Sequence, residues 1–238
     1  MKRKYILHAE TGQYNATGSS SRGILDATYT DRSIYVEGMY AEAKEWLANY
    51  EASQEKNSEL EDNLLKSLVP VAGEMYNESL FRGRFFITPP KSLRDFGPPP
   101  LYRAKRGRYN NKCVRALYLC SSVNGVIREL ELPPAGQRLW IQRFRLLPYL
   151  QFADARELPM DSLAAAIFLL IESVRDRSSQ PPRLGGRIGQ ILSSKYDGLI
   201  VPGVRGEPSE LYYNVIIFHP GNWWVKLLDS GAHPEEAF

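Results

Sequence analysis

Residues 107–131, GRYNNKCVRALYLCSSVNGVIRELE, carry the pattern that decides the fold. The segment opens with a glycine-bearing turn at 107–110. An apolar run at 115–120 follows and predicts a buried strand, while the more polar stretch at 123–130 is compatible with a helix or a strand. A turn, a strand and a third element therefore follow one another within a short length of chain.

Three side chains of different chemistry occupy these three elements, namely Arg108, Tyr118 and Glu129. An arginine in a glycine-bearing loop can approach a phosphate closely and bind it bidentately. Each residue also has a plain structural explanation when it is taken alone. Arg108 could be a surface cation, Tyr118 a core residue, and Glu129 part of an exposed charge cluster beside Arg128. Only their joint order indicates a functional site.

Further along the chain, strands and helices follow one another without a regular βαβ alternation. This order favours an α+β domain over a doubly wound parallel sheet. The Pro- and Gly-rich stretch 180–189 predicts a loop, and its glycines lack the context of a phosphate-binding fingerprint. The expected strands are 115–120, 139–144, 199–201 and 213–218, and the expected helices are 161–175 and 189–194.

The N-terminal third differs in composition from the rest of the chain. Residues 9–32 are rich in Gly, Ser, Thr and Asn, which is typical of turns, edge strands or an arm. A short strand is expected at 33–36, and spaced Trp and Leu residues at 41–68 predict one or two amphipathic helices. We therefore expect residues 1–75 to form a partly helical extension that packs on a main domain at 76–238.

The composition excludes several classes of protein. A chain of 238 residues with 43% hydrophobic and 24% charged residues is neither a collagen, a disordered tail nor a disulfide knot. Its net charge of +3 gives no reason to expect direct nucleic-acid binding. The longest apolar run, 163–171, falls short of the roughly 20 residues of a spanning helix, so no membrane span is expected. The short apolar stretch after the basic start predicts no signal peptide.

The cysteine and histidine content bears on metals and on location. The chain has two cysteines and three histidines, widely spaced, and these do not form a zinc-binding pattern. No metal is therefore expected. Two free thiols fit a reducing compartment, so we expect a cytoplasmic protein.

The order of the motifs resembles the RES domain family, which is named for an arginine, a glutamate and a serine of its site. The resemblance covers about residues 76 to 220. The matching segments are Phe81-Arg82-Gly83-Arg84, Gly97-Pro98-Pro99-Pro100, Gly107-Arg108-Tyr109-Asn110, Leu117-Tyr118-Leu119, Arg128-Glu129, Tyr196-Asp197-Gly198-Leu199-Ile200 and Asn214-Val215-Ile216-Ile217-Phe218.

This resemblance implies a fold similar to that of ADP-ribosyltransferases, with NAD as the substrate. RES proteins are typically toxins of bacterial toxin-antitoxin pairs. By the resemblance, Arg108 would hold phosphate and Tyr118 would stack against the nicotinamide side. Glu129 would bind the ribose hydroxyls and favour an oxocarbenium ion, as carboxylates do in glycosidases. The remaining expected contacts to NAD come from Arg82, Tyr109 and Asn214.

The resemblance does not decide which group accepts the ADP-ribosyl moiety or which partners the protein binds. Attack by water, phosphate or a protein side chain would make the protein an NAD glycohydrolase, an NAD phosphorylase or a protein ADP-ribosyltransferase. A toxin of this family implies a helix-turn-helix antitoxin as its partner. The N-terminal segment is a candidate for antitoxin contact, for homodimerisation or for autoinhibition.

One position departs from the family pattern. The serine of the family is expected after the Asp-Gly strand, where this chain has Gly203. The loss of one neutral hydrogen bond, worth roughly 0.5 to 1.5 kcal/mol, predicts weakened rather than abolished catalysis. Ser209 and Asn214 are candidate substitutes for the missing hydroxyl. A catalytically degenerate module that binds a nucleotide or a protein partner is the remaining alternative.

Overall fold

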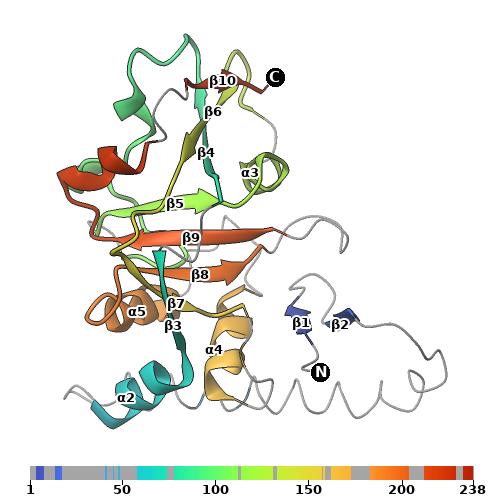
Figure 1. Ribbon diagram of the computed structural model, residues 1–238, viewed down its shortest axis with the longest axis vertical. Helices are drawn as coiled ribbons and strands as arrows, with labels where there is room; N and C mark the ends of the chain where they lie inside the picture. Colours follow the sequence, from blue (N-terminus) through green and yellow to red (C-terminus); the bar gives the residue numbers. More distant parts are fainter. Residues whose placement is uncertain are drawn as a thin grey trace, which may run out of the picture.

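A computed structural model gives the architecture of the chain (Figure 1). It describes residues 4–7, 14–17, 41, 45, 48, 58–73, 78–111, 114–130, 133–156, 158, 162–172, 183–203, 212–228 and 233–237.

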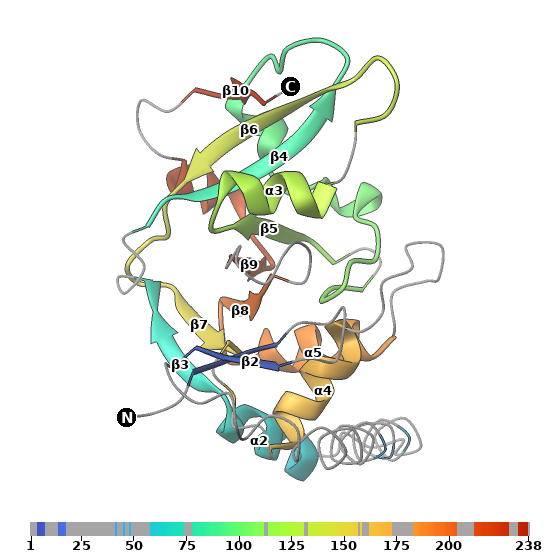
Figure 2. The ribbon, with the colours of Figure 1, turned by 90° about the vertical axis from the view of Figure 1, so that its right-hand side faces the viewer.

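The described residues form an α+β fold around an eight-stranded mixed sheet with the order β10-β6-β4-β5-β9-β8-β7-β3 (Figures 1 and 2). A hairpin of β1 (Lys4–Leu7) and β2 (Tyr14–Thr17) forms a second sheet. The strands of the main sheet are β3 (Val69–Ala72), β4 (Leu80–Phe86), β5 (Ala116–Cys120), β6 (Arg138–Phe144), β7 (Gln151–Asp154), β8 (Gly198–Pro202), β9 (Tyr213–Phe218) and β10 (Glu235–Glu236). The helices are α2 (Ser58–Ser67), α3 (Val123–Leu130), α4 (Leu163–Glu172) and α5 (Arg183–Leu192), and the 3-10 turns are η2 (Leu93–Phe96), η3 (Leu101–Arg103) and η4 (Asn222–Leu227).

The central strands are buried on both faces, as their continuous apolar sequences predict. On β5, Leu117 and Leu119 point to one face, where they pack in a cluster with Val215 and Ile217 of β9. Tyr118 points to the other face and packs against a second cluster, which includes residues of α4 and α5. Side chains alternate between the two faces along a strand, so each strand supplies both layers.

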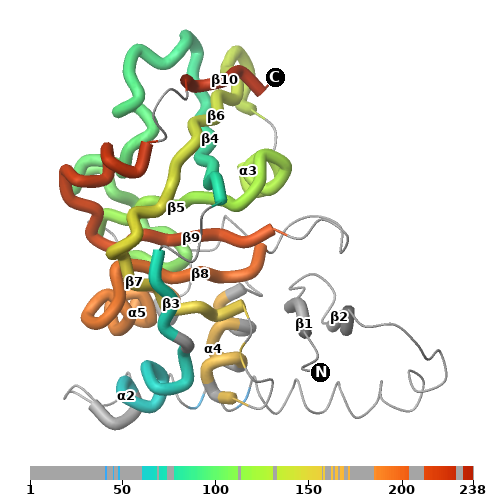
Figure 3. The backbone as a smooth tube through the Cα atoms, in the orientation of Figure 1, coloured from blue at the N-terminus to red at the C-terminus, as the bar shows by residue number. Residues whose placement is uncertain are grey.

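The sheet changes direction between β4 and β5. These strands pair through one pair of residues, Phe81 and Cys120, whereas β4 pairs with β6 along its whole length. Figure 1 shows β4 and β6 running steeply across the direction of β5 and β9, and the tube in Figure 3 follows the same turn. Beyond the shared pair, no strand ladder among the described residues covers the edge of β5 that faces β4.

Helices cover the two halves of the sheet separately. Helix α3 packs on β4 and β5 (Figure 2). It can approach β4 closely because a Cβ at Gly83 would lie 2.6 Å from Leu130 Cδ1. Helices α4 and α5 cover the half with β7 and β8, where Ile167, Ile171 and Ile188 are fully buried.

The structure confirms most of the central elements and corrects one. The strands expected at 115–120, 139–144, 199–201 and 213–218 correspond to β5, β6, β8 and β9. The loop expected at 180–189 is wrong from residue 183 onward, because α5 begins at Arg183 rather than at 189. The expected loop includes Gly185 and Gly189, which lie inside α5. In the structure, a Cβ at either of them would collide with the backbone carbonyl of Arg108 or Tyr109, so they let the helix pack on the 107–110 turn.

The structure describes part of residues 1–75, for which a partly helical extension is expected. Helix α2 lies within the expected helical stretch, and Leu64 and Leu68 belong to the same core cluster as α4 and α5. Strand β3 precedes the boundary expected at residue 76, yet it pairs with β7 in the main sheet. The last part of the expected extension is therefore built into the sheet. The strand expected at 33–36 lies outside the described residues.

Candidate active site

The turn that carries Arg108 is held by its neighbour Asn110, which is 5% exposed. The Asn110 side-chain amide donates hydrogen bonds to the carbonyls of Lys105, Asn111 and Val114 at 2.9 to 3.0 Å. The backbone N–H of Gly107 donates to the Asn110 carbonyl at 3.0 Å and closes the turn. A buried asparagine with this many partners fixes the loop in one conformation.

Tyr118 ties this turn to the sheet. Its hydroxyl donates to Asn110 Oδ1 at 2.8 Å and accepts from the backbone N–H of Tyr109 at 3.1 Å. A Cβ at Gly107 would lie 2.6 Å from the Tyr118 hydroxyl, so glycine is needed there for close approach. The half-buried phenol of Tyr118 therefore places the Arg108 backbone directly beside β5.

Glu129 lies in the last turn of α3 and is half-buried. Its Oε1 accepts two hydrogen bonds, one from the Tyr212 hydroxyl at 3.1 Å and one from Asn214 Nδ2 at 2.8 Å. Asn214 is the partner of Cys120 in the β5–β9 ladder. The carboxylate is thus directed toward the central sheet, and two donors restrict its rotation.

The structure brings the two halves of the predicted site to one face of the sheet. Tyr118 is paired with Ile216, and both point to the side that α4 and α5 cover. Asn214 is two residues from Ile216 along β9 and shares that face by alternation. The Arg108 turn is bound to Tyr118, and Glu129 is bound to Asn214. The turn that carries Arg108, the Tyr118 ring and the Glu129 carboxylate are therefore linked through adjacent positions of β5 and β9.

Arg82 lies where β4 and β5 diverge. Its Nη1 donates to the Tyr118 carbonyl at 3.2 Å, and its buried Nε has no hydrogen-bond partner in the described part of the chain. Burial, assisted by the nearby charge of Arg84, lowers the pKa of Arg82 to about 9. Arg84 donates to the carbonyls of Asp95 and Gly97 at 2.7 and 2.9 Å and anchors the proline-rich loop. Arg82 thus remains a cation near neutral pH although it is desolvated.

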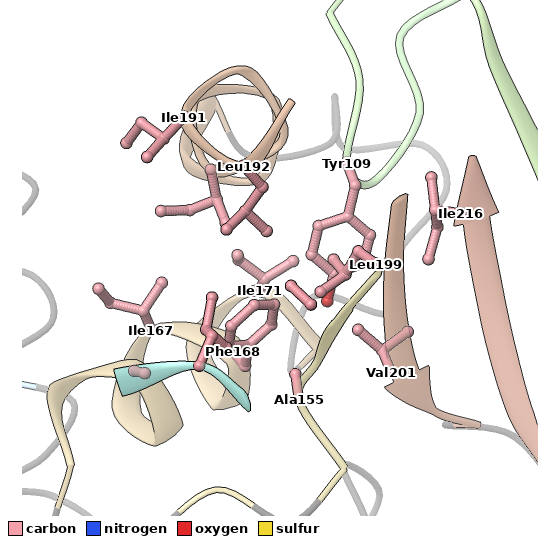
Figure 4. Packing of buried hydrophobic residues seen from close by; sticks show 14 of the residues in the cluster. Tyr109, Ala155, Ile167, Phe168, Ile171, Ile191, Leu192, Leu199, Val201 and Ile216 are labelled. Carbon is pink, nitrogen blue, oxygen red and sulfur yellow. The ribbon is translucent and has the colours of Figure 1, made fainter. Parts of the chain in front are cut away.

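The structure does not support the prediction that Tyr109 contacts NAD. The Tyr109 side chain is 1% exposed and lies inside the core cluster, with its ring centroid 6.0 Å from that of Phe168. Figure 4 shows the ring surrounded by Ile171, Phe168 and Leu199. A bound dinucleotide could not reach this ring without unpacking the core. The polar residues on either side of Tyr109 in the sequence give no indication of which way its side chain points.

Tyr212 is the site residue that the sequence analysis missed. It precedes β9, is 8% exposed, and its hydroxyl reaches Glu129. The signal that could have found it is its position two residues before Asn214, which places both side chains on one face of an extended segment. The Tyr212 ring also covers Gly203, whose N–H donates to the Tyr212 carbonyl at 2.8 Å.

The structure gives a steric reason for a glycine at position 203, where the resemblance leads us to expect a serine. A Cβ at Gly203 would collide with several atoms of the Tyr212 ring. The space into which a serine side chain would point is thus filled by a tyrosine that carries its own hydroxyl. Ser209, the other candidate for the missing hydroxyl, lies outside the described residues. Asn214 donates to Glu129 and in that sense belongs to the site.

The thiol next to the site is not activated. Cys120 is 4% exposed, and burial raises the pKa of its thiol to about 12, with the charge of Glu129 acting in the same direction. A thiol that stays protonated is a poor nucleophile. Cys113 lies outside the described residues.

Two searches limited to the described residues address metals and membranes. These residues contain no group of three or more His, Cys, Asp or Glu side chains that could hold a metal ion. Within the same ranges, no helix has the length and apolar character needed to cross a bilayer.

Comparison of the chain with family models, with curated proteins and with solved structures returns no match.

Proposed function

We propose that the protein cleaves the nicotinamide–ribose bond of NAD on a fold similar to that of ADP-ribosyltransferases. The observation that carries this proposal is the fixed carboxylate of Glu129, held by Tyr212 and Asn214 on the sheet face that also bears Tyr118. The divergence of β4 and β5 is consistent with a sheet that opens beside the site.

Glu129 would supply the electrostatic part of the reaction. Cleavage of the glycosidic bond turns the ribose into an oxocarbenium-like cation, which a prearranged carboxylate stabilises. At a separation of ~4 Å and an effective dielectric constant of about 20, this interaction is worth about 4 kcal/mol. Solvent around a half-buried group lowers that value, so a contribution of about 10²- to 10³-fold in rate is reasonable.

Two arginines would bind the pyrophosphate of NAD. Arg108 sits in a turn whose conformation Asn110 and Tyr118 fix, which lowers the entropic cost of binding an anion. Arg82 is a desolvated cation that donates a hydrogen bond to the backbone carbonyl of Tyr118. An anionic ligand near Arg82 would compensate part of the cost of its burial.

Tyr118 would contribute its ring rather than its hydroxyl. The hydroxyl is engaged with Asn110 and with the Tyr109 backbone, so proton transfer by this group would break the turn. The half-buried ring remains suitable for stacking on the planar nicotinamide. In the proposal, the Tyr118 ring therefore stacks on the nicotinamide, while its hydroxyl holds the 107–110 turn against the sheet.

The biological setting follows from the resemblance to RES domains. The protein would act in the cytoplasm as a toxin that depletes NAD, and a helix-turn-helix antitoxin would restrain it. The acceptor of the ADP-ribosyl group is water or phosphate in the leading version of the proposal, and a protein side chain in the alternative version. The two arginines and the carboxylate serve all three reactions equally.

A second candidate function, nucleotide binding without cleavage, is supported by the position of Tyr212. The Tyr212 ring fills the space beside Gly203, and its hydroxyl already binds the carboxylate that the reaction would use. If this arrangement keeps the ribose from Glu129, the protein would bind a nucleotide without cleaving it. This version predicts binding of NAD or ADP-ribose with no turnover.

One experiment separates these possibilities. The purified full chain is incubated with NAD, with and without inorganic phosphate, and nicotinamide and the ADP-ribose products are quantified by chromatography. Free ADP-ribose indicates hydrolysis, ADP-ribose 1″-phosphate indicates phosphorolysis, and a modified protein band in a lysate with labelled NAD indicates transfer. NAD binding by calorimetry without nicotinamide release favours the non-catalytic module. The proposal is rejected if the protein neither releases nicotinamide nor binds NAD.

A further inference from the structure

The position of Tyr212 is fixed by two glycines on different elements. A Cβ at Gly125 of α3 would lie 2.6 Å from Tyr212 Cδ2, and a Cβ at Gly203 after β8 would collide with the ring from another direction. The ring therefore fits only because both positions lack a side chain. Such a clamped aromatic ring has little rotational freedom.

The hydroxyl of the fixed ring donates a hydrogen bond to Glu129 Oε1 at 3.1 Å. Asn214 Nδ2 donates to the same oxygen, and the two donors come from alternate positions of one extended segment. A hydroxyl on a buried tyrosine needs a partner, and a hydrogen bond to an ionised acceptor is stronger than a neutral one.

From this geometry we infer that Tyr212 is a positioning residue for Glu129. Together with Asn214 it holds the carboxylate in one rotamer, so that the charge is already in place when the ribose becomes cationic. This inference rests on the proposed cleavage of NAD. The inference adds that the hydroxyl of Tyr212 orients the Glu129 carboxylate. It also adds that positions 203 and 125 require glycine because a side chain at either would clash with the Tyr212 ring.

The test compares two Tyr→Phe substitutions at neighbouring positions, each of which removes one hydroxyl. Tyr212→Phe keeps the ring between the glycines and removes only the hydroxyl. Tyr213→Phe is the matched control, because the Tyr213 hydroxyl donates to Glu78 Oε2 at 3.0 Å on the opposite face of the sheet. Both variants keep the packed ring, so both are expected to fold with similar thermal unfolding midpoints.

The kinetic readout distinguishes positioning from simple stabilisation. We expect Tyr212→Phe to lower kcat for nicotinamide release by about tenfold, with KM changed less than about twofold, because the acid and not the NAD contact is affected. Tyr213→Phe should match the wild type. In a Glu129→Gln background, Tyr212→Phe should cause no further loss. An equal loss in both backgrounds overturns the inference.

A measurement that does not depend on enzymatic activity separates the test of the positioning role from the test of the proposed function. The side-chain amide of Asn214 is followed by NMR, with the signal assigned by its loss in Asn214→Asp. We expect Tyr212→Phe to shift or broaden this signal, because the carboxylate that it binds gains freedom, and we expect Tyr213→Phe to leave it unchanged. An unchanged Asn214 signal in Tyr212→Phe overturns the positioning role whatever the kinetics. A changed signal in a protein that does not cleave NAD supports the positioning role and rejects only the NAD proposal.

Discussion

Replacement of Gly203 by serine tests how this chain differs from the family that it resembles. The family pattern alone predicts that the added hydroxyl gains a hydrogen bond, worth roughly 0.5 to 1.5 kcal/mol, and improves the site. The structure predicts the reverse, because the new Cβ would collide with the Tyr212 ring. Since that ring is clamped on its other side by Gly125, it cannot move away without disturbing α3.

The magnitude follows from overpacking. Insertion of extra atoms into a well-packed region costs typically about 1 to 3 kcal/mol. In a chain of this size that loss corresponds to a decrease in the unfolding midpoint of about 2 to 12 °C. Because the Tyr212 hydroxyl would move with its ring, the bond to Glu129 should be lost as well. We therefore expect Gly203→Ser to be less stable and less active than the wild type.

The assay is a double-mutant cycle measured by thermal and urea unfolding, with nicotinamide release measured in parallel. The second substitution is Tyr212→Ala, which removes the ring that the serine would meet. In that background Gly203→Ser should cost less than about 0.5 kcal/mol, since the clash no longer exists. A Gly203→Ser protein that is as stable as the wild type and more active, with Tyr212 in place, would refute the reasoning.

Three further predictions concern the turn, the helix and the thiol. Tyr118→Phe should lower the free energy of unfolding by about 1 to 3 kcal/mol in urea melts and weaken NAD binding in calorimetry, because the turn loses its two bonds to the hydroxyl. Gly185→Ala should cost at least as much in the same melts, because its Cβ would meet the Arg108 carbonyl, although alanine favours helix formation elsewhere. In a Cys113→Ser background, Cys120 should react with iodoacetamide at pH 9 several hundredfold more slowly than the unfolded chain, because its pKa of about 12 leaves the thiol protonated. The same raised pKa means that stability from this thiol is complete below pH 9 and is lost as the pH rises toward 12, which urea melts at pH 8 and pH 11 would detect.

The strands of the central sheet were predictable because most of their residues are apolar. The runs at 115–120 and 213–218 can be buried only in the middle of a sheet, and they became the adjacent strands β5 and β9. The start of α5 was not predictable from propensity, because its glycines are unfavourable in an isolated helix. Packing against the 107–110 turn overrides this preference. Strand β3 contains Pro70, which normally argues against a strand, and it is tolerated at the sheet edge.

The candidate site was predictable in its residue types and not in its contacts. Arg108, Tyr118 and Glu129 were expected on three successive elements, and in the structure the ladder between β5 and β9 places Tyr118 near Asn214, the partner of Glu129. No sequence pattern indicates that the Tyr118 hydroxyl would be used by the turn. The role of Tyr212 was hidden for a similar reason, because it depends on glycines far apart in the sequence that become neighbours only in the folded chain.

The substitution Glu129→Gln tests the central claim most directly. Glutamine keeps an oxygen that can accept from Tyr212 and Asn214, so the fold and the two hydrogen bonds can persist while the negative charge is removed. Nicotinamide release from NAD should be measured for the wild type and for this variant at equal concentrations of folded protein. The account predicts turnover by the wild type and a decrease of about 10²- to 10³-fold in the variant. Equal rates for the two proteins, or no release by the wild type above the spontaneous decay of NAD, would contradict it.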